Sequence, residues 1–127
     1  MAKEEIERLR GSRILLVEDE PLLLMALADE LERVGAIIVG PAGSLDRALE
    51  VAGAIQIDGA ILDISLHAES IFPLADLLAN RNIPFIFASA QDCSQFPSRF
   101  LNAPFCPKPA LPMEVIATLA RLFVSRG

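Results

Sequence analysis

Polar side chains end four short apolar runs of this chain. They are Glu18 and Asp19 after the first run, Asp63 at the end of the third, and Ser89 and Lys108 after two later runs. Runs of this length are typical of strands buried on both faces, which occur in parallel sheets covered by helices. Ligands of such sheets bind beyond the carboxyl ends of the strands. The five side chains are therefore expected to meet at one crevice.

The three acids of this group indicate a metal site. Clustered carboxylates raise one another's proton affinity unless a cation neutralises them. Magnesium takes one or two carboxylates together with waters and phosphate oxygens, which suits Asp19, Asp63 and an incoming phosphoryl group. We expect Glu18 to contribute through a bound water and the backbone carbonyl of Ser65 to complete the site. The expected cofactor is Mg²⁺.

Asp63 is the candidate nucleophile. A carboxylate can attack phosphorus to form an aspartyl phosphate, and Lys108 and the Ser89 hydroxyl would then hold the phosphoryl oxygens. Positioning and neutralisation of charge carry most of such catalysis, so these groups are chemically sufficient without a general base. His67, the only histidine, lies four residues past Asp63, and we interpret it as a solvated loop residue.

Apolar runs alternate along the chain with segments that carry apolar residues at helical spacing. Strands are predicted over 13–17, 36–39, 59–64, 84–88 and 105–107, and helices over 21–34, 45–53, 71–80 and 112–123. Pro97 interrupts residues 93–103, where we expect a short helix or mostly loop. The alternation predicts an α/β fold, a flavodoxin-like (βα)5 three-layer sandwich with a parallel sheet in the order 2-1-3-4-5.

Local signals mark the ends of these elements. Pro21 suits the first turn of a helix, and Gly35 suits the left-handed position that ends one. Ser44 and Ser70 are predicted to cap the second and third helices. The prolines that flank the last strand suit an edge position in the sheet.

Length and composition narrow the class of protein. The 127 residues suffice for one domain, 53% of them are hydrophobic, and the net charge of −6 argues against a basic nucleic-acid surface. No apolar stretch approaches the roughly 20 residues of a membrane span, and the first residues lack the hydrophobic region of a signal peptide. We expect a cytoplasmic protein that contacts neither nucleic acid nor membrane, with Cys93 and Cys106 as free thiols.

The strand ends lie in motifs that resemble the receiver domain of two-component response regulators. The motifs are Leu15-Leu16-Val17-Glu18-Asp19, Leu62-Asp63, Ala88-Ser89-Ala90 and Pro107-Lys108-Pro109. The resemblance implies that Asp63 accepts a phosphoryl group from a histidine kinase or histidine phosphotransferase while Glu18 and Asp19 bind Mg²⁺. It implies a signalling phosphoacceptor rather than an enzyme. It also implies that Phe105 changes rotamer as Ser89 moves toward the phosphoryl group.

A narrower resemblance concerns residues 83–89, which look like those of stand-alone receivers with a Phe-Ala-Thr-Gly-Tyr-type motif; Ala90 and Gln91 replace its Gly-Tyr pair. We expect residues 13–127 to form a single receiver domain with no output domain. Such a protein would act in a phosphorelay by binding a downstream protein that the sequence does not identify. Residues 1–12 form a short charged extension, either frayed or docked as a helix.

The helix predicted over 21–34 is more apolar than one sheet face requires. Leu22, Leu23 and Met25 are therefore the expected contacts for a phosphodonor helix bundle. Receivers often pair through the face formed here by residues 91–103 and the last helix, so we expect a monomer or a weak homodimer. The alternative function is a pseudo-receiver, an interaction module that works without phosphorylation.

Overall fold

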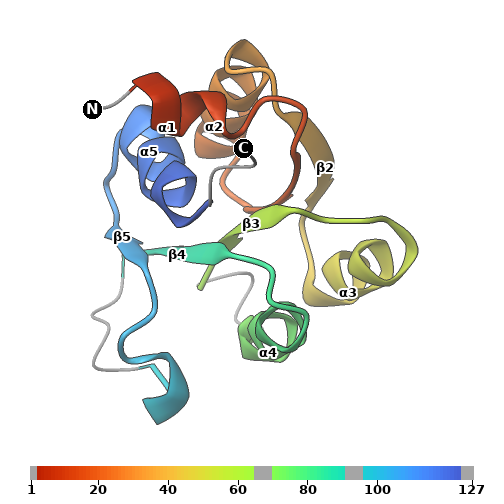
Figure 1. Cartoon of the computed structure of the whole chain (residues 1–127). Helices are drawn as coiled ribbons and strands as arrows, with labels where there is room; N and C mark the ends of the chain where they lie inside the picture. Colours follow the sequence, from red (N-terminus) through yellow and green to blue (C-terminus); the bar gives the residue numbers. More distant parts are fainter. Residues whose placement is uncertain (1–2, 65–69, 91–95, 124–127) are drawn as a thin grey trace.

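Five parallel strands form one sheet in the computed structural model, which describes residues 3–64, 70–90 and 96–123. The strands are β1 (Arg13–Val17), β2 (Ile37–Ala42), β3 (Gly59–Asp63), β4 (Phe85–Ser89) and β5 (Phe105–Pro107). Their order is β2-β1-β3-β4-β5, and each neighbouring pair is parallel (Figure 1). The predicted flavodoxin-like (βα)5 topology is confirmed, with β5 at one edge.

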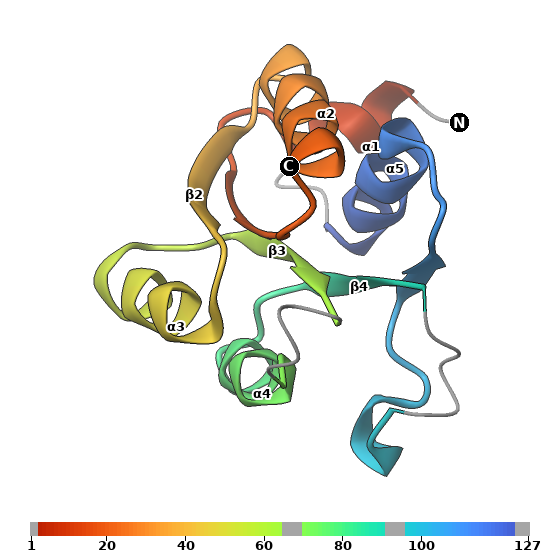
Figure 2. The same ribbon diagram turned by 180° about the vertical axis from the view of Figure 1, so that it is seen from behind.

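Helices cover both faces of this sheet. They are α1 (Lys3–Glu7), α2 (Pro21–Arg33), α3 (Leu45–Ala54), α4 (Phe72–Asn80) and α5 (Pro112–Leu122), with the 3₁₀ helix η3 at Ser98–Phe100. Helices α1, α2 and α5 lie on one side of the sheet, and α3 and α4 lie on the other (Figures 1 and 2). The short helix expected within 93–103 is η3, as far as residues 96–103 describe that segment.

Two hydrophobic cores result because successive strand side chains point to opposite faces. Leu15, Val17, Leu62 and Phe87 pack toward α3 and α4, while Ile14, Leu16, Ile61 and Ile86 pack toward α2 and α5. All eight are at most 1% exposed. The sheet is therefore the middle layer of a three-layer sandwich, and its strand ends are held rigidly from both sides.

The prediction for β2 was too short and began one residue early. Its pairing with β1 shifts register after Leu15, so that Val17 pairs with Ala42 and the strand continues past Gly40 and Pro41. Gly40 has φ +95°, and a Cβ there would lie 2.9 Å from the Ala42 nitrogen. Proline fits because β2 is an edge strand, whose outer N–H groups have no ladder partner.

The predicted helix ends were confirmed in three cases and wrong in one. Pro21 is the first residue of α2. Gly35 has φ +86° and follows Val34, the C-cap of α2, and the Ser44 hydroxyl accepts a hydrogen bond from the Arg47 amide at 3.2 Å. Ser70 is not the N-cap of α4, because that position belongs to Ile71. The Ser70 hydroxyl accepts a hydrogen bond of 3.4 Å from the amide of Phe72, but α4 begins at Phe72, one residue later than predicted, so Ser70 stands one residue before the N-cap.

The N-terminal segment is docked rather than frayed over its described residues. Leu9 is fully buried in the core beneath α2 and α5. Arg8 Nη1 donates a hydrogen bond of 3.0 Å to the Phe123 carbonyl, and Arg121 lies 3.7 Å from Glu5 in an ion pair. These contacts join α1 to the end of α5 (Figure 1).

Gly59→Ala is expected to lower the free energy of unfolding by about 1 to 3 kcal/mol, because overpacking a filled core forces side chains from their rotamers. Gly59 is buried at the start of β3, and a Cβ there would lie 2.8 Å from Phe123 Cζ and 3.2 Å from Ile14 Cδ1. Urea denaturation measures the change. Gly53→Ala is the control: Gly53 lies in α3 with open space around it, and alanine there should be neutral or stabilising. Equal stabilities of the two variants would contradict the packing argument.

Candidate functional site

The carboxyl ends of four strands meet at one edge of the sheet. The strands end at nearly the same position along the sheet, since Val17 of β1 pairs with Leu62 of β3 and Asp63 pairs with Ala88 of β4. Residues that follow β1 therefore stand beside the end of β3. The order in which successive strands join the sheet reverses between β1 and β3, and ligands of open α/β sheets bind at such a switch point.

Three acids converge at this edge. Glu18 and Asp19 follow β1 and Asp63 is the last residue of β3, and one carboxylate oxygen from each lies within 4.8 Å of the others. Glu18 and Asp63 are each 1% exposed, while Asp19 is half-buried. The predicted acidic cluster is therefore present, with its open side at Asp19.

Lys108 reaches the acids from the end of β5. Its Nζ donates a hydrogen bond of 3.2 Å to Glu18 Oε2, and it lies 3.0 Å from Glu18 Oε1 and 3.5 Å from Asp63 Oδ2. Partial burial lowers the pKa of Lys108, but the hydrogen bond to Glu18 and the charges of Asp63 and Glu18 outweigh it, so the pKa is raised. Lys108 is thus a fixed positive charge at the site.

One positive charge does not balance the cluster. Burial, followed by the hydrogen bond with Asp63, raises the pKa of Glu18 to about 7. Glu18 Oε1 is a buried oxygen for which the described residues supply an ion pair but no hydrogen bond. Such an oxygen, in a cluster of three carboxylates, fits a hard divalent cation that prefers oxygen ligands.

Ser89 lies on β4, the strand next to β3, and Phe105 lies on β5, one strand farther from the acids. Ser89 is fully buried at the end of β4, and its carbonyl accepts a hydrogen bond of 2.7 Å from the Lys108 amide. Phe105 is half-buried on β5, and its ring meets the ring of Phe96 edge to face, with centroids 5.5 Å apart. The structure thus brings together the side chains of four expected residues, Glu18, Asp19, Asp63 and Lys108. Ser89 ends the adjacent strand β4, and Phe105 lies on β5.

Sequence reasoning missed the part played by Glu20. Its backbone amide donates a hydrogen bond of 3.1 Å to Glu18 Oε2, and its carboxylate lies 3.9 Å from Lys108 Nζ. The signal was available, because Glu20 directly follows the two predicted ligands. Ser65 and His67, which were assigned a metal-binding carbonyl and a solvated loop position, lie outside the described residues, as do Gln91 and Cys93.

The apolar residues proposed for partner binding lie in the first turns of α2. Leu22 is 79% and Met25 62% exposed, whereas Leu23 is half-buried. Leu23 also lines a hollow of about 340 Å³ that reaches Lys108 and the loop before α5. Leu111, 67% exposed, precedes α5. Apolar surface therefore adjoins the acidic site.

No helix among residues 3–64, 70–90 and 96–123 is long and apolar enough to cross a membrane.

The sheet order and its acidic edge define the receiver class of flavodoxin-like folds. CheY4 of Vibrio cholerae, a chemotaxis response regulator, shares the fold at a TM-score of 0.78 and 18% identity, over 89% of this chain and 99% of its own. SdrG from Sphingomonas melonis Fr1 is 40% identical, with a TM-score of 0.77 over 90% of this chain and 98% of SdrG. The chain belongs to the receiver-domain family of response regulators.

Other comparisons concern longer proteins and another state. The regulator PhyR of Methylorubrum extorquens is 31% identical over 94% of this chain and 46% of its own length. The chain spans less than half the length of the curated relatives it matches. SdrG also has a BeF3-activated solution structure, 38% identical to this chain with a TM-score of 0.72 over 90% of it and 98% of SdrG. No protein-family model matches the chain.

Proposed function

We propose that Asp63 is the phosphoacceptor of a two-component phosphorelay and takes a phosphoryl group from a histidine kinase or histidine phosphotransferase. The observation that carries this proposal is the contact set of Lys108, whose Nζ lies 3.5 Å from Asp63 and 3.0 Å from Glu18 where three carboxylates converge. A lone capping or loop aspartate would have no need of this buried cluster. A BeF3-activated conformation of SdrG supports the same conclusion.

In the proposed reaction a carboxylate oxygen of Asp63 forms a bond to phosphorus as the bond from phosphorus to the donor nitrogen breaks. The electron pair of that bond leaves with the donor imidazole. Lys108 neutralises charge on the phosphoryl oxygens, and the Ser89 hydroxyl at the next strand end hydrogen-bonds to them. The signalling protein therefore assists its own phosphorylation without turning over a separate substrate.

We assign Glu18, Asp19 and Asp63 as the residues that hold Mg²⁺, together with the backbone carbonyl of Ser65. When bound, Mg²⁺ neutralises the carboxylates and the phosphoryl oxygens. Oε1 of Glu18, which has an ion pair with Lys108 but no hydrogen bond among the described residues, and the raised pKa of that carboxyl support this assignment. Glu18 is held for the role by the Glu20 amide, which binds its other oxygen.

We further propose that Ser89 and Phe105 carry the response to phosphorylation. Ser89 would move toward the phosphoryl group, and Phe105 on β5 would change rotamer to fill the space it leaves. The domain would then bind a downstream protein in the cytoplasm. Residues 83–89 support membership of the Phe-Ala-Thr-Gly-Tyr-type subgroup.

Acetyl phosphate with Mg²⁺ tests the central proposal. Wild-type protein should gain the mass of one phosphoryl group, and removal of Mg²⁺ by a chelator or the change Asp63→Asn should abolish the gain. Asp58→Asn is a control acid at the opposite, amino-terminal end of β3 and should leave the gain intact. Absence of any gain in the folded wild type would overturn the proposal and favour the phosphorylation-independent module.

Leu22→Glu is expected to slow phosphotransfer from the cognate donor by about tenfold, because a charge replaces an apolar contact near the centre of the proposed interface. The donor is first found by a phosphotransfer screen against the histidine kinases of the source organism, and transfer is followed with the labelled phosphodonor. Phosphorylation by acetyl phosphate should not change.

Ile55→Glu is the matched control for this substitution. Ile55 is also exposed, at 42%, but follows α3 on the other side of the sheet. It should leave transfer unchanged. Transfer at the wild-type rate in Leu22→Glu would exclude α2 as the docking helix.

A further inference from the structure

Residues 97–103, which contain η3, are attached to the rest of the domain mainly by side chains. Their backbone hydrogen bonds in the described structure stay within the segment: the amides of Phe100, Leu101 and Ala103 donate to Pro97, Ser98 and Phe100. Segments without backbone ties to the sheet open at lower free energy than the core. What holds η3 in place is therefore a matter of a few side-chain contacts.

One of these contacts is an ion pair to α4. Arg99 donates two parallel hydrogen bonds to Asp76, from Nε to Oδ1 at 2.7 Å and from Nη2 to Oδ2 at 2.9 Å. The two-point geometry is the arrangement in which an exposed ion pair has a measurable effect. The hydrogen bond from Arg99 holds the pKa of Asp76 below its ordinary value.

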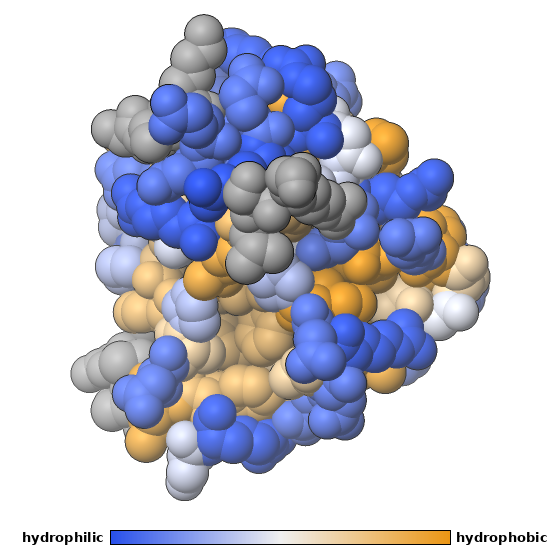
Figure 3. All heavy atoms as spheres, in the orientation of Figure 1, coloured by the Kyte–Doolittle hydropathy of each residue, from blue (hydrophilic) through white to orange (hydrophobic). Residues whose placement is uncertain are grey.

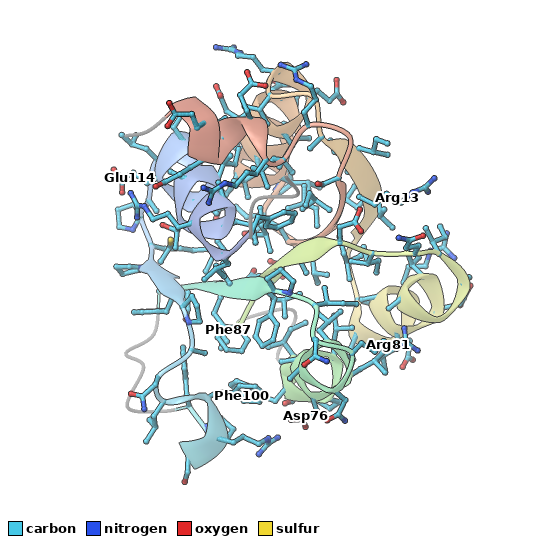
Figure 4. The ribbon with its side chains drawn as sticks, viewed as in Figure 1. Arg13, Asp76, Arg81, Phe87, Phe100 and Glu114 are labelled. Carbon is cyan, nitrogen blue, oxygen red and sulfur yellow. The ribbon has the colours of Figure 1, made fainter. Side chains whose placement is uncertain are left out.

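Aromatic rings form the second set of contacts. Phe100 of η3 stacks on Phe72 of α4, with centroids 5.7 Å apart and planes 18° from parallel, and the Arg99 guanidinium lies 5.0 Å from the Phe100 centroid. Figure 4 shows Asp76, Phe87 and Phe100 on one side of the sheet. Apolar surface gathers in this region between β5 and α4 (Figure 3). An ion pair and a stacked pair of aromatic rings therefore hold η3 against α4.

The same rings lead back to β5. Phe96, just before η3, meets the rings of Phe72, Phe87 and Phe105 at centroid distances of 5.9, 5.3 and 5.5 Å. It is 6% exposed. Because the Phe105 ring packs edge to face on the buried Phe96 ring, a new rotamer of Phe105 changes the packing around Phe96. Movement of Phe96 would in turn displace η3 from α4.

We propose that the Arg99–Asp76 pair is a latch that holds η3 against α4 in the unphosphorylated protein and opens when Asp63 is phosphorylated. The link between latch and acceptor runs through Phe96 and Phe105 and rests on the proposed function. The ion pair stabilises the arrangement in which η3 lies against α4, which we call closed, so it opposes activation. Breaking it shifts the population toward the open, activated state, and a ligand that prefers that state then binds more tightly.

Amide hydrogen exchange measured by NMR tests the latch without phosphorylation. Arg99→Gln should speed exchange at the Phe100 and Ala103 amides by about two- to fivefold, and the charge swap Arg99→Asp with Asp76→Arg should restore the wild-type rates. Arg47→Gln is the matched control, since it removes an exposed arginine that pairs with Glu50 at 2.9 Å on α3. Unchanged exchange in Arg99→Gln, or an equal change at these amides in Arg47→Gln, would overturn the proposal.

Titration with BeF3 and Mg²⁺ tests the link to the acceptor. Arg99→Gln should reach half-saturation at about two- to fivefold lower BeF3 concentration than the wild type, and Arg47→Gln at the wild-type concentration. Faster exchange with no change in BeF3 affinity would show a purely structural contact and reject the latch. If the wild type binds no BeF3 at all, the proposed phosphoacceptor function fails, whereas the exchange experiment still decides whether the ion pair holds η3.

Discussion

Glu18→Gln should raise the free energy of unfolding of the metal-free protein above that of the wild type at about pH 8. The same substitution should abolish the stabilisation of the protein by Mg²⁺. The pKa of Glu18 is about 7 in the folded protein against 4.5 ordinarily, because burial and Asp63 disfavour its charged form. The folded state therefore binds more protons than the unfolded chain between these values. The stability contributed by the bound proton is complete below pH 4.5 and lost as the pH rises through 7, a loss on the order of 3 kcal/mol.

Chemical denaturation across this pH range measures the effect. The wild-type unfolding free energy should fall between about pH 5 and pH 8 without metal and recover when Mg²⁺ is added. The unfolding free energy of Glu18→Gln should lack the decrease that comes from Glu18, because glutamine has the same shape and cannot ionise. Adding Mg²⁺ should raise the unfolding free energy of this variant only slightly. Glu50→Gln, on the exposed face of α3, is the control and should follow the wild type. A Glu18→Gln protein that Mg²⁺ stabilises as strongly as the wild type would remove Glu18 from the metal site.

Phe87→Ala is expected to lower the free energy of unfolding by about 3 to 5 kcal/mol, the cost of removing a large buried side chain and leaving a cavity. The side chain is fully buried on β4, and its ring contacts those of Phe72, Phe85, Phe96 and Phe100. Edge-to-face ring pairs add to the stabilisation that burial alone provides.

Urea denaturation of Phe87→Ala beside Phe85→Ala measures this difference. Phe85 is two residues earlier on the same strand, touches the same cluster and is only half-buried, so its loss should cost clearly less. Should the two variants lose equal stability, burial of Phe87 would not be what holds this layer together.

The fold and the acidic cluster followed from patterns that are local in the sequence. Each strand is a short apolar run, and the position where the run ends determines which residue lies at the carboxyl end of the strand. The parallel topology then placed Glu18, Asp63 and Lys108 together without any knowledge of their contacts. Prediction of this part succeeded because one rule, the common edge of parallel strands, determines all of it.

Features that depend on distances between side chains did not follow. The extension of β2 past Gly40 requires a register shift that only its pairing with β1 determines. Docking of Leu9 depends on the space left between α2 and α5. The pairing of Arg99 with Asp76, 23 residues apart, has no periodic signal at all. Roles for Ser65 and for partner contacts at Leu22, Leu23 and Met25 stay predictions.

The phenylalanine cluster also makes one layer of the protein visible to spectroscopy. The chain has no tryptophan or tyrosine, and six of its seven phenylalanines (Phe72, Phe85, Phe87, Phe96, Phe100 and Phe105) lie on the α3–α4 side of the sheet. Phe123 packs on the other side. Near-ultraviolet circular dichroism, which detects aromatic rings in fixed asymmetric surroundings, would therefore report chiefly on that one layer. Loosening of the α2–α5 layer, where the apolar turns of α2 lie, would pass almost unseen in this signal.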